Sequence, residues 1–138
     1  MVHDRIQQTH VARGAVVRIT CDLSDAELLA VAHVTDAVKR ARYAGVALDA
    51  ATMLTMHALI ALTDQALERA QDGDGGGTLV LTVDRLGLLV DSLREWLTQR
   101  EQVGFVRMQQ AIARPLVEDM LGDLSELYDR ALGVALSG

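Results

Sequence analysis

Apolar residues recur at helical spacing in several segments of the chain, and polar or glycine-rich breaks separate these segments. The pattern predicts several helices. The most apolar stretch covers residues 48–70, LDAATMLTMHALIALTDQALERA. Its large side chains point in every direction around a helical axis, so the first three turns lack a polar side: Leu54, Met56, Leu59, Ile60 and Leu62. A helix that is apolar all round is normally enclosed by other helices or by a partner chain.

An earlier helix is predicted to begin at Asp25, because a capping box precedes it. Ser24 is followed three residues later by Glu27, which is the spacing at which the two residues cap each other. Apolar residues then share one side of the helix: Leu28, Val31, Val34, Val38 and Ala41. Gly45 supplies a C-terminal stop.

A third helix is predicted after Thr82, which has the side chain of an N-cap. Its apolar residues fall within about a third of the helical circumference: Leu86, Leu89, Val90, Leu93, Trp96 and Leu97. The helix is therefore amphipathic and needs a core on one side only.

The last helical pattern, residues 106–132, continues in phase through Pro115. Proline inside a helix removes a hydrogen bond and clashes with the preceding turn. Either one helix is kinked at Pro115, or Arg114 ends a short helix and Pro115 begins another. We favour the kink, because the apolar phase is unbroken.

Two short β-branched runs, residues 16–21 and 78–83, predict strands. Each run leads into an N-cap and an amphipathic helix, and LSDAELLAVAHV is similar to LTVDRLGLLVDSL: Leu23 with Leu81, Ser24 with Thr82 and Leu28 with Leu86 align without gaps. Two explanations of this similarity are open: a duplication of a β-α-α unit, or the signals that many helix starts have in common. The predicted fold is mainly α, of the α+β class, with a four-helix arrangement and two short strands.

The chain of 138 residues has the size of one domain. We expect a flexible N-terminal lead-in over residues 1–14 and a single helical domain over residues 15–134, with a glycine-rich loop at 71–77. Residues 135–138 are expected to fray.

The net charge of −6 argues against nucleic-acid binding, which needs a positive surface. Cys21 is the single cysteine, so no disulfide can form within the chain and a reducing compartment is expected. The first twenty residues lack the apolar core of a signal peptide, and no run approaches a membrane span. These features predict a cytoplasmic protein that does not bind membranes.

No residue pattern predicts catalysis, a metal site or a cofactor. His33 and Asp36 stand one helical turn apart, but the Glu-x-x-His pairs of di-iron bundles are absent from the sequence. Cys21 has no histidine assignable as its base. The acidic stripe of the last helix is expected to be a solvated side, with a basic docking partner as the other interpretation: Asp119, Asp123 and Glu126.

His57 borders an apolar stripe, so it is either a hydrogen-bonded core or interface histidine or part of a ligand pocket. The candidate pocket residues are His57, Met53, Met56, Asp64, Trp96 and Tyr128. The candidate interface residues are Leu54, Leu59 and Leu62. We expect a non-enzymatic interaction or regulatory module that forms a homodimer and can bind a protein partner; the alternative is a small-molecule-binding or enzymatic bundle with a pocket beside His57.

Overall fold

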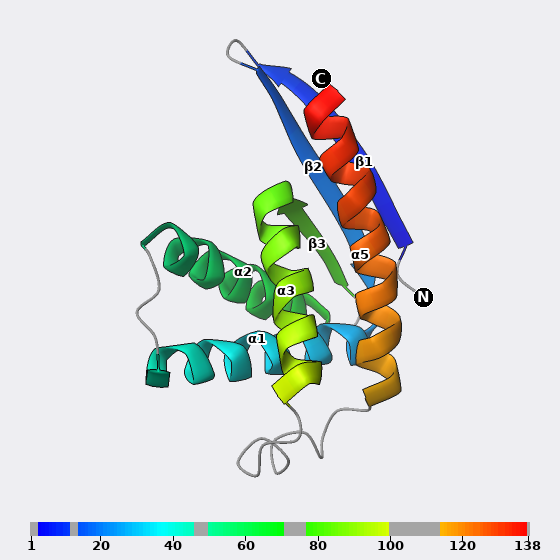
Figure 1. Ribbon diagram of the computed structural model, residues 1–138. Helices are drawn as coiled ribbons and strands as arrows, with labels where there is room; N and C mark the ends of the chain where they lie inside the picture. The colour runs from blue at the N-terminus through cyan, green and yellow to red at the C-terminus, as the bar shows by residue number, and fades with distance from the viewer. Residues whose placement is uncertain (1–2, 12–13, 46–49, 71–76, 100–113, 138) are drawn as a thin grey trace.

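The computed structural model describes residues 3–11, 14–45, 50–70, 77–99 and 114–137 (Figure 1). The described part contains a three-stranded sheet and four helices, which confirms the mainly helical α+β class. The elements in chain order are β1 (His3–Val11), β2 (Gly14–Leu23), α1 (Asp25–Gly45), α2 (Ala50–Arg69), β3 (Gly77–Thr82), α3 (Val83–Gln99) and α5 (Arg114–Ser137).

The sheet is antiparallel, in the order β1-β2-β3. β1 pairs with β2 over its whole length, from His3 opposite Asp22 to Val11 opposite Gly14. β3 pairs only with the second half of β2, from Arg18 to Leu23. The first half of β2 and its partner in β1 therefore extend beyond β3 as a two-stranded ribbon, and the C-terminal half of α5 lies beside this ribbon (Figure 1).

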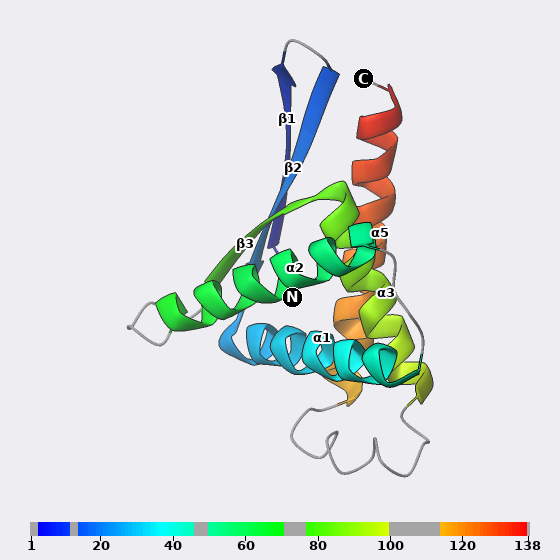
Figure 2. The same ribbon diagram turned by 90° about the vertical axis from the view of Figure 1, so that its left-hand side faces the viewer.

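The helices cover one side of the sheet, as Figure 2 shows. The strand residues on that side are buried: Val17, Ile19, Cys21, Leu23, Leu79 and Leu81. The alternate residues Arg18, Asp22, Thr78 and Val80 are exposed, which is the period-two pattern of a sheet with one solvated face. On that face the Thr78 hydroxyl donates a hydrogen bond to Asp22 Oδ1 at 2.8 Å.

β1 occupies most of the segment that we expected to be a flexible lead-in, so residues 3–11 need correction to a strand. Both strands expected from β-branched runs are present, as β2 and β3. β1 has no such run. Its backbone is ordered by its pairing with β2, a tertiary interaction that local strand propensity does not report.

The capping box at the start of α1 is confirmed. The Ser24 N–H donates to Glu27 Oε1 at 2.9 Å, and the Glu27 N–H donates to Ser24 Oγ at 3.2 Å. α1 ends at Gly45, as expected. The start of α3 uses the same device in a simpler form, because the Arg85 N–H donates to Thr82 Oγ1 at 3.4 Å.

Substituting Ser24 by alanine is expected to lower the free energy of unfolding by about 1 kcal/mol, because the first turn of α1 loses its cap. Urea denaturation followed by circular dichroism measures the change. Thr98→Ala is the matched control, because the Thr98 side chain is exposed and its hydroxyl donates to the Arg94 carbonyl of its own helix, at 2.9 Å. Equal costs for the two substitutions would contradict a capping role for Ser24.

α5 begins at Arg114, so Pro115 stands in its first turn, where proline is tolerated. The predicted kink depends on the chain before Arg114, and residues 100–113 lie outside the described part, as does the glycine-rich loop up to residue 76. At the other end, α5 continues to Ser137, which corrects the expected fraying from residue 135. Val134 packs against the core and holds the last turns.

The two halves of the chain make matched contacts. α1 packs against α3, α2 packs against α1 and β3, and α5 packs against α3 and β2. Residues at aligned positions of α1 and α3 are buried alike: Leu28 with Leu86, Val31 with Leu89, and Val38 with Trp96. An internal β-α-α duplication remains a prediction. A duplication of this kind would produce two halves with matched packing.

The core between the helices includes three buried hydroxyl side chains. Each donates to the backbone carbonyl one turn earlier: Thr35 to Val31 at 2.7 Å, Thr63 to Leu59 at 2.8 Å, and Ser92 to Leu88 at 2.8 Å. Because each hydroxyl is satisfied within its own helix, the helices can pack closely around it without an orphaned polar group. No helix in the described part has the length and apolar content needed to cross a membrane.

Candidate functional site

Two adjoining hollows, of about 350 and 290 Å³, are lined by residues of α3 and its neighbours. α3 runs between α2 and α5 (Figure 1). We name the two hollows together the α3 hollows. The larger is lined by Ala51, Thr52, Thr55, Asp84, Gly87, Leu88, Asp91 and Tyr128. The smaller is lined by Gly87, Val90, Asp91, Arg94, Ser125, Tyr128 and Asp129. The residues common to both are Gly87, Asp91 and Tyr128, so the two hollows adjoin at these three residues.

Gly87 determines where this ring lies. A Cβ atom at position 87 would lie 2.9 Å from Tyr128 Cε1 and 3.2 Å from Cζ, both closer than normal van der Waals contact. Glycine inside a helix costs up to about 1 kcal/mol relative to alanine, so it needs a reason. Here the reason is that the Tyr128 ring of α5 packs directly on the backbone of α3.

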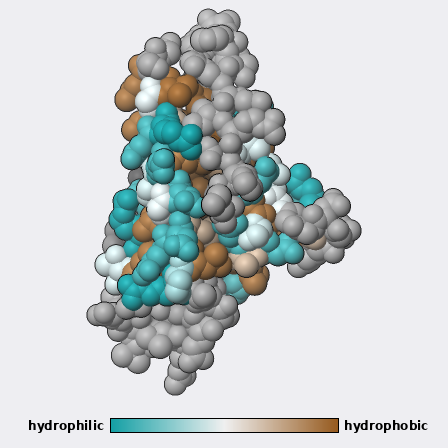
Figure 3. Space-filling model, turned by 90° about the vertical axis from the view of Figure 1, so that its right-hand side faces the viewer, coloured by the Kyte–Doolittle hydropathy of each residue, from teal (hydrophilic) through white to brown (hydrophobic). Residues whose placement is uncertain are grey.

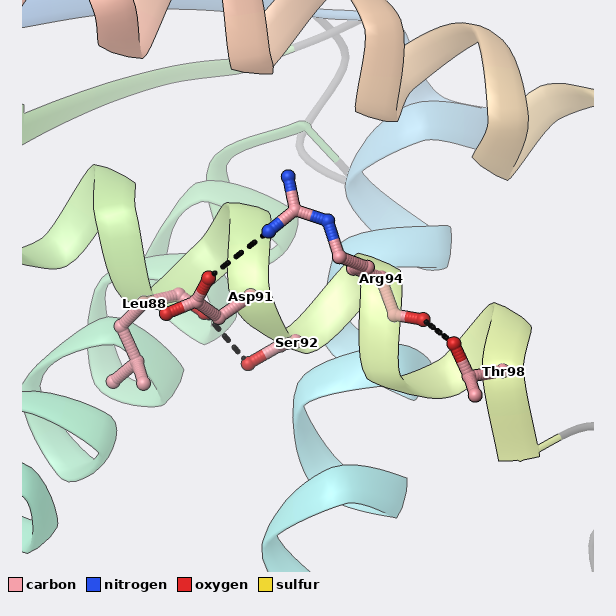
Figure 4. A network of polar contacts seen from close by, with 5 residues as sticks. All are labelled: Leu88, Asp91, Ser92, Arg94 and Thr98. Atoms are coloured by element: carbon pink, nitrogen blue, oxygen red, sulfur yellow. Dashed lines mark hydrogen bonds and ion pairs between the residues drawn. The ribbon is translucent and has the colours of Figure 1, made fainter.

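The charged groups of the α3 hollows are mainly acidic. Asp84 lies in the first turn of α3, where the helix dipole favours a carboxylate. Asp91 Oδ1 lies 3.5 Å from Arg94 Nη1, and Figure 4 shows the two side chains together on one side of α3. Asp129 is exposed on α5. The lining residues thus carry three carboxylates and one guanidinium.

Asp84 and Asp91 stand seven residues apart on α3, so their Cα atoms are separated by about 10.5 Å along the helix axis. Both lie on the side of α3 that faces the hollows. Two negative charges at this separation cannot bind one small cation together. They can bind two cationic groups of a single elongated molecule.

The described residues contain no group of three or more His, Cys, Asp and Glu side chains able to hold a metal ion. Asp36, the predicted neighbour of His33, instead forms an ion pair with Arg40 at 3.1 Å. His33 is exposed.

The predicted pocket residues are distributed over different parts of the structure. Tyr128 lines both α3 hollows, and the other five line neither: His57, Met53, Met56, Asp64 and Trp96. Met56 and Trp96 are in the core, Met53 is half-buried, and His57 and Asp64 are exposed on α2. The hollows therefore lie beside Tyr128 and not beside His57.

The predicted interface residues differ in their exposure to solvent. Leu59 is fully buried in the core, Leu62 is half-buried against it, and Leu54 is 72% exposed. Apart from Ala51, which lines the larger hollow, the exposed residues in the first part of α2 include no Asp, Glu, Lys or Arg, and we call them the α2 outer face: Ala50, Leu54, His57 and Ala61.

α5 forms much of another face of the molecule, shown in Figure 3. Hydrophilic colour covers its lower part, in agreement with the exposure of the acidic stripe: Asp119, Asp123 and Glu126. Apolar colour gathers at the upper end, where α5 ends and Leu136 is 80% exposed. The acidic stripe lines neither α3 hollow.

Sequence reasoning missed most of the hollow-lining residues, including Gly87, Asp84 and Asp91. One signal was available, because Gly87 interrupts the apolar run of an otherwise strong amphipathic helix. Such a glycine indicates a close approach by another group. It does not say which residue approaches, because Tyr128 is distant in sequence.

The chain matches no protein-family model, no curated protein and no solved structure. The α2 outer face and the α3 hollows are the two surface features of the described residues that bear on function.

Proposed function

We propose that this protein is a non-enzymatic cytoplasmic interaction or regulatory module that acts as a helical homodimer, joined through the α2 outer face. The observation that carries the proposal is the 72% exposure of Leu54 within a helix surface that has no Asp, Glu, Lys or Arg. Exposed apolar surface of this kind marks interaction sites, although a single exposed leucine would not. The alanines and His57 around Leu54 extend this surface along the helix without an Asp, Glu, Lys or Arg side chain.

A second copy of the chain suits this surface for two reasons. A two-fold interface must be complementary to itself, and small alanines beside one large leucine let each Leu54 pack between the small residues of the partner. The chain also carries a net charge of −6, so two copies repel each other wherever acidic surfaces meet. The α2 outer face has no acidic residue before Asp64 and avoids that repulsion.

The filled interior beneath this surface supports a non-enzymatic role. Met56 and Leu59, on the inner side of α2, are at most 1% exposed. His57 lies on the outside of the helix and lines neither α3 hollow. A cytoplasmic location is proposed because Cys21 is the single cysteine, so no disulfide can form within the chain, as is usual for proteins of a reducing compartment.

Leu54→Glu is expected to weaken dimerisation at least about tenfold, because it buries a carboxylate at the proposed interface. Sedimentation equilibrium from about 1 to about 100 µM protein, a range that covers micromolar dissociation constants, measures the association. Leu136→Glu is the matched control: Leu136 is an equally exposed leucine on α5, at 80%. It should leave the dissociation constant unchanged.

Two results would overturn the proposed interface. One is a wild-type chain that remains monomeric at about 100 µM. The other is a dimer that Leu136→Glu weakens as much as Leu54→Glu does, because the contact would then involve the end of α5. Circular dichroism of both variants verifies that they are folded.

A further inference from the structure

We propose that the α3 hollows bind a linear polyamine, a flexible chain with protonated amines at both ends. This inference goes beyond the interaction role and does not depend on the dimer. It begins from two adjoining open hollows of about 350 and 290 Å³, which share Gly87, Asp91 and Tyr128 as lining residues. A space of this size accommodates a small molecule.

The charge of the lining residues selects a cation. The carboxylates of Asp84, Asp91 and Asp129 exceed the single guanidinium of Arg94. Arg94 lies beside Asp91, at 3.5 Å, and no ion pair of Asp84 or Asp129 occurs among the described residues. An anionic ligand would meet two carboxylates in the larger hollow, and two carboxylates against one guanidinium in the smaller, whereas an ammonium group can pair with a carboxylate in each hollow.

The spacing of the carboxylates selects a long ligand. Asp84 lies in the larger hollow and Asp129 in the smaller, with Asp91 between them. The Cα atoms of Asp84 and Asp91 alone are about 10.5 Å apart along the axis of α3. Spermidine in its extended form has a comparable separation between its terminal nitrogens, and putrescine is much shorter. Spermidine can therefore reach two carboxylates where putrescine reaches one.

Tyr128 supplies the middle of the site. Its ring lines both hollows and is held on α3 by the absence of a side chain at Gly87. The ring face can cover the methylene groups of the ligand and attract a central ammonium group through a cation–π interaction. Leu88, half-buried on α3, adds apolar surface in the larger hollow. The methylene segments of a polyamine match this apolar middle between acidic ends.

Isothermal titration calorimetry of the full chain with spermidine and with putrescine tests the proposal. We expect spermidine to bind with a dissociation constant between about 10 µM and about 1 mM, and putrescine to bind at least about fivefold more weakly. Asp84→Asn should weaken spermidine binding about fivefold or more. Asp123→Asn is the matched control, since Asp123 is an exposed aspartate on α5 that lines neither hollow, and it should have no effect.

Gly87→Ala provides a test that changes no charge. Its Cβ would lie 2.9 Å from the Tyr128 ring, so the ring must move and the middle of the site must change shape. Spermidine binding should weaken in this variant at equal net charge. Circular dichroism melting curves of every variant separate a change at the site from a loss of folding.

Three results would overturn the proposal. Equal weakening by Asp84→Asn and Asp123→Asn would mean that spermidine responds only to the overall negative charge. Equal affinity for putrescine and spermidine would contradict the two-carboxylate spacing. A dissociation constant above about 1 mM for spermidine would remove the site altogether. A monomeric wild-type chain would contradict the proposed dimer and leave these expectations unchanged.

Discussion

Substituting Leu59 by alanine is expected to lower the free energy of unfolding by about 2–5 kcal/mol, whereas Leu54→Ala should lower it by less than about 0.5 kcal/mol. The two leucines stand five residues apart on α2, but Leu59 is 0% exposed and Leu54 is 72% exposed. Truncating Leu59 removes buried apolar surface and leaves a cavity that the surrounding helices fill only partly. Truncating Leu54 removes side-chain atoms that are already in water.

Urea denaturation followed by circular dichroism measures both changes, at a protein concentration below the dimer dissociation constant. The loss at Leu59 is a large part of the total of about 5–15 kcal/mol that holds a typical domain together. If both substitutions cost more than about 2 kcal/mol under these conditions, Leu54 would be buried within its own chain. If neither substitution has a cost, α2 would not pack on the core as described.

Leu54 and Leu59 show what a sequence pattern does not predict, namely which apolar side of a helix is buried. The pattern of residues 48–70 predicts a helix with apolar residues all round, and α2 is that helix. Periodicity cannot tell which apolar side the chain covers by itself, because that depends on the positions of α1, α3 and β3, which pack against α2. The predicted interface residues therefore separated into one exposed, one half-buried and one fully buried leucine.

Features encoded by neighbouring residues were predicted well. The start of α1 depends on Ser24 and Glu27, three residues apart, and both capping hydrogen bonds form. β1 depends on pairing with β2, so its polar sequence gave no local signal. The α3 hollows need α2, α3 and α5 to come together, and of their lining residues only Tyr128 was among the predicted pocket residues.

Trp96→Ala is expected to lower the free energy of unfolding by about 3–5 kcal/mol, because it removes the largest side chain of the core. The sequence placed Trp96 among the candidate pocket residues, but the structure buries it at 2% exposure in the core. Trp96→Phe keeps most of the apolar volume and should cost clearly less. This second variant remains folded and measurable even if the alanine variant unfolds.

Trp96 is the single tryptophan of the chain, so its fluorescence reports on this one position. The emission maximum of the folded protein should be shifted to the blue relative to the urea-unfolded chain, and acrylamide should quench it poorly. Spermidine should leave the emission unchanged, since Trp96 lines neither α3 hollow. Emission at the wavelength of a solvated indole, together with an alanine variant as stable as the wild type, would contradict the core position. A buried Trp96 instead supports the folded framework on which Gly87, Asp84 and Asp91 are arranged along the same helix.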